Sequence, residues 1–144
     1  MSTPVTQLRG STEQSLLTTE LNSLANDALA LSGEITLTDA GYLLADLTLV
    51  VTYGVAPTVN TAVAVWLLRE TDGTNYEDGG ASLTPARAPD LVFPLRAVTT
   101  AQRITRQVML PPGKFKALTK NDGTGQAMAS SGNTLKLKAS TVQQ

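Results

Sequence analysis

The sequence of 144 residues contains neither cysteine nor histidine. Without cysteine, no disulfide can hold the fold together and no thiol can act as a nucleophile. Without histidine, a Ser–His–Asp triad is excluded, and both side chains that zinc prefers are missing. We therefore expect a protein that is not an enzyme and has no catalytic residues, no metal site and no cofactor.

Aromatic and charged residues are also scarce, at 4% and 16% of the chain, whereas hydrophobic residues make up 42%. A disordered chain has the opposite balance, with low hydrophobicity and high net charge. The apolar residues are mostly Ala, Leu and Val, and Thr and Ser are abundant. Thr and Val suit a pleated, half-buried surface. This composition predicts one globular domain rich in β-structure.

Long apolar runs and targeting signals are missing as well. No stretch approaches the roughly 20 apolar residues of a membrane-spanning helix. Residues 1–15 lack the cationic and then apolar pattern of a secretory signal. The glycine-containing segments 72–80 and 121–125 lack the Gly-Lys-Ser/Thr ending of a phosphate-binding loop. We expect synthesis in the cytosol and no membrane partner.

The charges are unevenly distributed along the chain although the net charge is only −1. Residues 1–80 hold ten acidic and two basic side chains, a formal charge of −8. Residues 81–144 hold nine basic and two acidic side chains, a charge of +7. Either the two halves interleave in one sandwich and their charges mix, or the surface is bipolar and docks against copies of itself or a larger assembly.

The beginning of the chain reads as an arm. Residues 1–15 are polar and contain Pro4 and Gly10, which favour an extended or irregular segment. Residues 16–144 read as a single domain. In residues 16–31, leucines recur at helical spacing, but Asn and Asp side chains compete for backbone hydrogen bonds. We expect a short helical turn there, followed by a strand near residues 28–38.

From Gly41 onward the hydrophobic period is two, as in antiparallel strands over a core. Residues 43–53 alternate clearly, and residues 62–68 are apolar on both faces, which predicts a central strand with Trp66 in or near the core. Pro94 places a further strand at an edge or a bulge. The last strand carries outward lysines, which are common on exposed edges. Seven or eight strands in total indicate a sandwich or a barrel.

Arg106 lies on the apolar parity of the strand predicted at residues 104–110. A long cationic side chain in such a position either extends its charged end to solvent or meets a partner.

Two groups of acidic residues are candidates, one for binding calcium and the other for acting on a sugar. Calcium favours oxygen ligands such as those of Asp72, Asn75, Glu77 and Asp78, but their spacing departs from the EF-hand pattern because Tyr76 takes a ligand position. A carboxylate pair acting on a sugar would have to come from residues such as Asp46, Glu70 and Glu77, whose spacing singles none of them out. Acid-rich turns are usually solvated turns.

Two kinds of surface binding were also weighed. Single-stranded nucleic acid requires exposed aromatics beside basic residues, and the aromatics near the basic stretch, Phe93 and Phe115, lie in hydrophobic patterns. We therefore expect no direct contact with nucleic acid. A sugar-stacking platform could come from Trp66, Tyr42, Tyr53 and Tyr76, although Trp66 sits where a core residue belongs.

A series of short motifs, in this order, resembles a family of small virion structural proteins of tailed bacteriophages. The similarity covers roughly residues 15–140, and the motifs stand at residues 21–26, 45–47, 66–68, 72–79, 93–96, 101–103, 110–116 and 131–136. The resemblance implies an antiparallel, jelly-roll-like β-sandwich without an active site. It implies a capsid cement or decoration protein in the virion, or a minor part of the tail, made in the bacterial host.

The resemblance also directs attention to interfaces. Cement proteins bridge neighbouring capsomers as small oligomers, so we expect the partners to be the major capsid protein and other copies of this chain, as a homodimer or a trimer. The candidate interface is the arm together with a basic face, comprising Arg9, Arg103, Arg106, Lys136 and Lys138. The alternatives are a tail component or a β-sandwich module that binds carbohydrate or a host surface.

Overall fold

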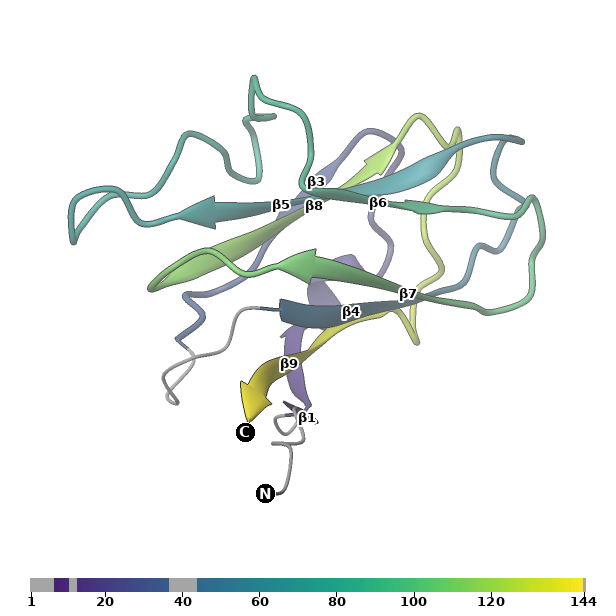
Figure 1. The fold of residues 1–144 in the computed structure, drawn as a ribbon. Helices are drawn as coiled ribbons and strands as arrows, with labels where there is room; N and C mark the ends of the chain where they lie inside the picture. Colours follow the sequence, from purple (N-terminus) through teal and green to yellow (C-terminus); the bar gives the residue numbers. More distant parts are fainter. Residues whose placement is uncertain (1–6, 11–12, 37–43, 144) are drawn as a thin grey trace.

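The computed structural model describes residues 7–10, 13–36 and 44–143, with the side chains of 7–10 and 141–143 excepted. The described residues form two β-sheets that face each other, seen as an upper and a lower layer in Figure 1. The predicted all-β sandwich is confirmed. No described helix is long and apolar enough to cross a membrane.

The described residues contain nine strands and one short 3-10 helix. The strands are β1 (Gln7–Gly10), β2 (Gln14–Leu17), β3 (Leu29–Leu31), β4 (Leu44–Val51), β5 (Ala62–Arg69), β6 (Leu91–Pro94), β7 (Gln102–Met109), β8 (Phe115–Asp122) and β9 (Thr134–Gln143), and the helix η1 is Thr19–Leu21.

Sheet A has the order β1-β9-β4-β7, and β2 also pairs with β9, beside β1. Sheet B has the order β3-β8-β5-β6. All pairings are antiparallel, and four of them are nested: β2 with β9, β3 with β8, β4 with β7 and β5 with β6. The chain is therefore arranged as one long hairpin that has been folded over into two layers.

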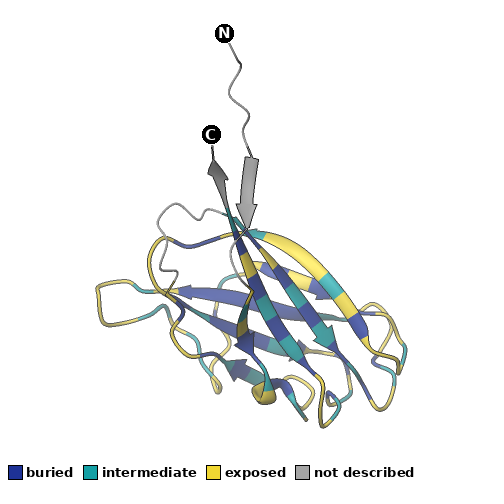
Figure 2. Ribbon diagram, turned by 90° about the horizontal axis from the view of Figure 1, so that it is seen from below, coloured by how far each residue is buried: buried dark blue, intermediate teal, exposed yellow. Residues whose placement is uncertain are grey.

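The alternation of β4 positions the main core. Ala45, Leu47, Leu49 and Val51 are buried and face sheet B, while the residues between them are exposed or half-buried. Figure 2 shows the same stripes of buried and exposed residues along the strands of sheet A. Sequence alternation predicted this face correctly because each strand buries only one side.

A second apolar cluster lies on the outer side of sheet B. It contains Ala64, Trp66, Leu68 and Leu118, and the loop of residues 70–90 covers it. The loop is packed so closely that a Cβ atom on Gly79 would lie 3.1 Å from Leu68 Cδ1 and 3.1 Å from Pro85 Cγ. Trp66 is 4% exposed, so its predicted burial is confirmed, although a loop rather than the opposite sheet buries it.

Buried amides tie the loops to one end of the sandwich. The side-chain amide of Asn121 donates to the carbonyl oxygens of Leu24, Ala25 and Gln126 and accepts from the hydroxyl of Tyr53. Because each of these polar groups is paired, the connections can approach the core without leaving unsatisfied donors.

The segment 16–31 combines the expected elements. Its first residues belong to β2, η1 follows, and β3 begins at Leu29. The short helical turn was predicted correctly. The following strand was predicted at the right place but too long, because β3 ends at Leu31 and residues 32–36 contain only an isolated bridge at Ile35; residues 37–38 lie outside the described part.

The sequence predicted the position of β6 in its sheet correctly and the position of β9 wrongly. β6 ends at Pro94 and lies at the edge of sheet B, as the proline indicated. β9 is not the edge strand that its lysines suggested, because β4 pairs with one of its sides and β1 and β2 pair with the other. The segment 1–15 that we expected as an arm supplies β1 and the first two residues of β2.

Candidate interaction surface

The β7 strand forms one edge of sheet A. β4 pairs with one of its sides, and no described strand pairs with the other. Arg103, Thr105, Arg106, Gln107 and Met109 of this strand are exposed, and Met109 is 75% exposed. In Figure 2 the corresponding edge strand is mostly coloured as exposed. An edge strand offers unpaired backbone N–H and C=O groups to a partner.

The register between β4 and β7 shows which side chains of β7 face the core. Ile104 and Arg106 stand opposite the buried Leu49 and Leu47, so they share the inward parity. Arg103 stands opposite Val50 and faces outward. Arg106 is nevertheless exposed, and its Nη1 donates a 3.1 Å hydrogen bond to the carbonyl oxygen of Val92. The expectation that Arg106 extends to solvent or to a partner is therefore confirmed.

The outer face of sheet A carries a polar hollow of about 230 Å³. Its lining consists of Glu13, Asp46, Thr48, Thr105, Lys136, Leu137 and Lys138. The Thr48 and Thr105 hydroxyls lie 2.9 Å apart across the pair β4–β7, and Lys136 Nζ lies 3.1 Å from the carboxylate of Glu13. The hollow is smaller than most small-molecule sites, which begin at about 300 Å³, and it is lined by charges of both signs.

The structure distributes the five predicted interface residues over three places. Lys136 and Lys138 lie on the outer face of sheet A, and Arg103 lies on the same face at its edge. Arg106 lies on the inward parity of that edge. Arg9 belongs to β1, and its side chain lies outside the described part.

Ion pairs show how the two oppositely charged halves of the chain meet. Glu77 pairs with Arg87, Glu34 with Lys114 and Glu13 with Lys136, and each pair joins an acid before residue 80 to a base after it. The interpretation that the halves interleave and their charges mix is therefore correct for much of the surface.

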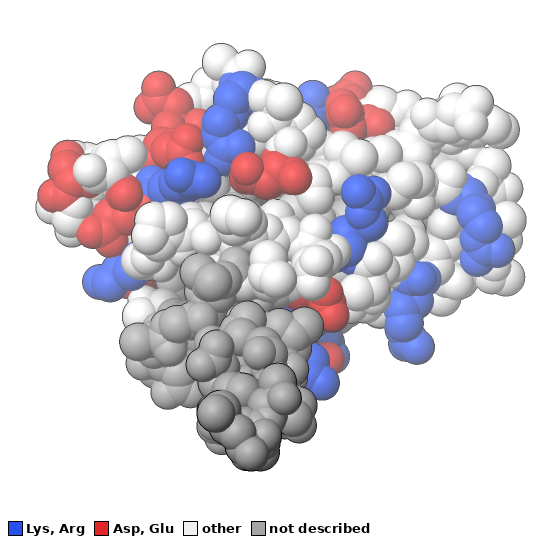
Figure 3. All heavy atoms as spheres, in the orientation of Figure 1, with Lys and Arg blue, Asp and Glu red and all other residues white. Residues whose placement is uncertain are grey.

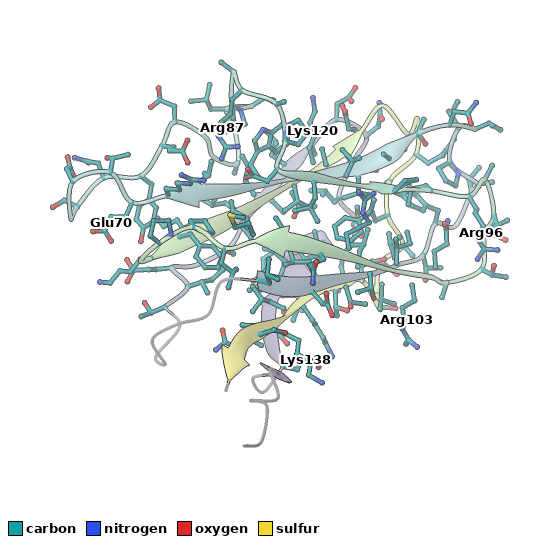
Figure 4. The ribbon with its side chains drawn as sticks, in the orientation of Figure 1. Glu70, Arg87, Arg96, Arg103, Lys120 and Lys138 are labelled. Atoms are coloured by element: carbon teal, nitrogen blue, oxygen red, sulfur yellow. The ribbon has the colours of Figure 1, made fainter. Side chains whose placement is uncertain are left out.

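Four basic side chains remain without an acidic or aromatic partner among the described residues: Arg96, Arg103, Arg106 and Lys138. We call them the unpartnered cations. Figure 3 shows blue side chains over the right-hand part of the front face, whereas most of the red groups lie toward the left and others lie at the upper centre and beside the grey atoms at the lower centre. In Figure 4, Arg96, Arg103 and Lys138 point away from the sandwich.

Arg96 was missed in the sequence analysis. Its backbone N–H and carbonyl oxygen both bond to the side-chain amide of Gln102, at 2.8 Å each, which fixes the turn from β6 into β7. The signal that could have found it is the stretch of residues 91–121, which contains no acidic residue. A base inside such a stretch has few local partners.

The carboxylates of Asp72 and Glu77, which were considered as calcium ligands, have separate hydrogen-bond partners. Asp72 accepts bonds from the backbone N–H groups of Thr74 and Asn75 and from the Asn75 amide, which lower its pKa. Glu77 instead accepts from the backbone N–H of Arg69 and from Arg87. Within the described ranges, no three acidic side chains are grouped so that they could hold a metal ion.

The carboxylates and aromatics considered for sugar chemistry are also separated. Asp46 lines the hollow of sheet A, whereas Glu70 and Glu77 belong to the loop over sheet B. Tyr53 and Trp66 are buried. Tyr76 donates to Glu34, with Lys116 Nζ 4.5 Å from the centre of its ring, and Tyr42 lies outside the described residues. The described aromatics therefore do not form a common stacking platform.

A scan against protein-family models and a search of curated proteins return no match to this chain.

Proposed function

We propose that this chain is a structural virion protein of a tailed bacteriophage, a capsid cement protein that binds the lattice of major capsid proteins and stabilises the head. The role is structural rather than catalytic. The observation that carries the proposal is the concentration of unpartnered cations on one side of a rigid sandwich, around β7 and the outer face of sheet A.

The fold supports this role through its connectivity. We infer that the nested pairing of β2 with β9, β3 with β8, β4 with β7 and β5 with β6 is that of a jelly roll, the architecture of many capsid components. It agrees with the resemblance of the sequence motifs to virion proteins.

The surface supports attachment to a repeated lattice. Arg103 and Lys138 form no ion pair with a described acid, although Asp46 stands opposite Lys138 in the β4–β9 register. An acidic surface of the capsid protein could therefore pair with both cations. Copies that bind many equivalent sites, or that associate with one another, are retained strongly because each further contact forms at high effective concentration. Self-association as a homodimer or a trimer belongs to the same proposal.

Particles that lack the protein provide the test. Purified chain is added to them at increasing concentration, occupancy is measured by co-sedimentation, and cryo-electron microscopy of the refilled particles locates the added density. We expect saturable binding to the head. Density on the tail would favour the alternative of a tail component, and absence of binding to the particle would overturn the proposal.

The arm should be examined with a limited deletion. Removal of residues 1–15 would also take away β1 and the first residues of β2, which pair with β9, so weaker binding could then reflect a damaged sheet. Removal of residues 1–6 alone leaves both strands. If that shorter deletion reduces occupancy while the melting temperature stays unchanged, residues 1–6 take part in docking.

A further inference from the structure

We propose that the open edge of β7 binds an extended, acidic segment of a partner protein, which adds to sheet A as one more antiparallel strand. The inference rests on the proposed function only for the source of that segment, which would be the capsid lattice. The strand addition itself depends only on β7 and the residues around it.

The β7 edge of sheet A is long and has no strand on its outer side among the described residues. β7 has eight residues, whereas β3 has three and β1, β2 and β6 have four each. Proteins protect exposed edges by shortness, proline, bulges or charged side chains, and of these β7 has only the last, in Arg103 and Arg106. β6 ends in Pro94, but β7 contains no proline and pairs with β4 in unbroken register over all eight residues. Among the described strands it is therefore the edge best suited to accept another strand.

The positive charges around β7 indicate that the added strand is acidic. Arg103 and Arg106 lie on β7 and Arg96 on the turn before it, and none has an acidic partner in the described structure. Residues 91–121 contribute no acid of their own. An incoming acidic strand would supply the missing countercharge, and opposite charges across strands stabilise the pairing.

The same charges select against a second copy as the added strand. If two β7 strands paired with each other, Arg103 and Arg106 from both copies would line one seam without any acid. Like charges across a seam are destabilising. Edge arginines therefore work as a specificity device that rejects self-pairing at this edge and admits an acidic segment.

The inward and outward directions of the β7 side chains determine the sequence pattern of the segment that would bind. Arg103 faces outward and Arg106 inward, while Ile104 and Val108 share the inward parity and are half-buried. An antiparallel strand opposite these residues would present apolar residues to Val108 and Ile104 and acidic residues to Arg106 and Arg103. Read from its N-terminus, the segment is apolar, any, acidic, any, apolar, acidic.

Arg106 is oriented in advance for this contact. Its Nη1 is held by the carbonyl oxygen of Val92 on β6, and its remaining N–H groups have no partner among the described residues. A guanidinium that is already positioned loses less freedom when it binds a carboxylate.

Synthetic peptides with this pattern test the proposal on the whole chain. A labelled acidic peptide is titrated with the protein at low salt and binding is followed by fluorescence anisotropy. We expect saturable binding that an amide version, with Gln in place of Glu, does not show. The double variant R103E/R106E should bind the acidic peptide about tenfold more weakly, since two attractive cross-strand pairs become repulsive.

The control is a single charge reversal, Lys138→Glu on β9, two strands away from the edge, and it is compared with the single variants R103E and R106E as well as with the double variant. It should leave peptide binding nearly unchanged. A peptide with Lys at the two acidic positions should bind R103E/R106E better than it binds the native chain, which would exclude loss of folding as the cause.

Backbone methylation of the peptide separates strand addition from general attraction of anions. Two peptides are methylated at alternate backbone nitrogens, so that in one of them the methyl groups face β7. Only that one should lose binding. If both bind as well as the unmodified peptide, or if single-stranded DNA of equal charge competes equally well, the edge is a general anion surface and the proposal is wrong.

The results of the peptide experiment can be told apart from those of the particle-binding experiment that tests the proposed function. If the peptides fail while the chain still fills cement-free particles, only the strand addition is overturned. If the peptides bind as predicted but the chain does not bind particles, the edge is real and the virion role is wrong.

Discussion

The indole Nε1 of Trp66 donates a 3.0 Å hydrogen bond to the backbone carbonyl oxygen of Arg87. The side chain of the same arginine reaches back to β5, where Nη2 donates to the carbonyl oxygen of Leu67 at 3.0 Å. Its other nitrogens bond to the carboxylates of Glu77 and Asp90. Arg87 therefore fastens the loop of residues 70–90 over the outer apolar cluster of sheet B.

The first prediction concerns this fastening. Arg87→Ala should lower the free energy of unfolding by about 2 kcal/mol, because hydrogen bonds to charged groups are lost and a half-buried carbonyl and two carboxylates lose their donor. Trp66 should become more accessible to a water-soluble quencher of tryptophan fluorescence. Arg87→Lys should restore little, since an ammonium group cannot reproduce the forked contacts.

Arg96→Ala serves as the control for the loop, because Arg96 is exposed and its side chain has no partner in the described structure. It should leave both quenching and stability unchanged. Equal quenching in the native chain and in Arg87→Ala would show that the loop stays closed without the guanidinium.

The second prediction is a loss of stability in acid. Burial by itself would raise the pKa of Glu77, but the backbone N–H of Arg69 and the guanidinium of Arg87 outweigh it and lower the pKa below 4.5. The unfolded chain then binds this proton more readily than the folded chain. The stabilisation is therefore complete above the ordinary pKa and is lost as the pH falls through the folded value.

Denaturant unfolding at several pH values checks this linkage. Glu77→Gln should be less stable than the native chain near neutral pH, and the difference should shrink as the pH falls below about 4.5. Comparison of the two proteins isolates Glu77 from Glu20, Glu34 and Asp72, whose pKa values are lowered as well. A difference that stays constant with pH would contradict the prediction.

The third prediction concerns alkaline conditions. Burial raises the pKa of Tyr53 to about 12, and its hydroxyl donates to Asn121 at 2.8 Å. A folded-state pKa above the ordinary value of 10.0 means that this stabilisation is present below that value and is lost as the pH rises toward 12. Ultraviolet absorbance should show Tyr53 ionising late, close to the alkaline unfolding transition.

Tyr53→Phe tests the attribution. The variant should lose about 1 kcal/mol near neutral pH, since Asn121 still accepts a hydrogen bond from Thr124. Its stability should depend less on pH above about 10 than that of the native chain. Tyr76, whose pKa is also raised to about 12 by its bond to Glu34, is removed from the absorbance signal with Tyr76→Phe.

The fourth prediction is a stabilising substitution. Thr119 on β8 is fully buried, and its hydroxyl has no hydrogen-bond partner among the described residues. Val has nearly the same shape and the same preference for strands. Thr119→Val should therefore raise the free energy of unfolding by about 1 kcal/mol, because the chain no longer buries an unpaired hydroxyl. A loss of stability would show that the hydroxyl has a partner in solution.

Local sequence patterns predicted where the strands lie along the chain, but they did not predict which strands pair with each other in the sheets. The alternation of β4 is a property of one segment, since every second side chain must face the core, and Pro94 can end a strand by itself. The position of β9 between β4 and the two N-terminal strands depends on pairing across almost the whole chain. Outward lysines on β9 were therefore misread as the mark of an edge.

The candidate surface was predicted in part for the same reason. The parity of Arg106 is local, and its exposure was anticipated. The partner of Lys136 is Glu13, which lies far away in the sequence and reaches it only because β2 pairs with β9. The acid-free stretch 91–121 could have drawn attention to Arg96, but nothing in the sequence shows that Lys136 has a partner, because that pairing follows from the fold.

The fifth prediction separates binding from stability on that surface. Arg96, Arg103 and Lys138 are exposed and make no side-chain contact with an acid in the described structure. In the triple variant, Arg96 and Arg103 are reversed to Glu and Lys138 is replaced by Gln, because Glu at position 138 would stand opposite Asp46. The combined change should alter the free energy of unfolding by no more than about 0.5 kcal/mol per site. Arg106 is left intact in this variant because its side chain donates a hydrogen bond to the carbonyl oxygen of Val92, which a reversal would remove.

Binding to cement-free particles should respond quite differently. The native chain should lose occupancy as salt rises, because exposed charges are screened within about 10 Å at 0.1 M salt, and the triple variant should bind weakly with a flatter salt dependence. Lys114→Glu is a single-site control: it reverses a cation whose side chain is 48% exposed but which pairs with Glu34, in the connection between β7 and β8. If the triple variant and the control fill particles equally at every salt concentration, the docking face lies elsewhere on the sandwich, and the unpartnered cations serve only solubility.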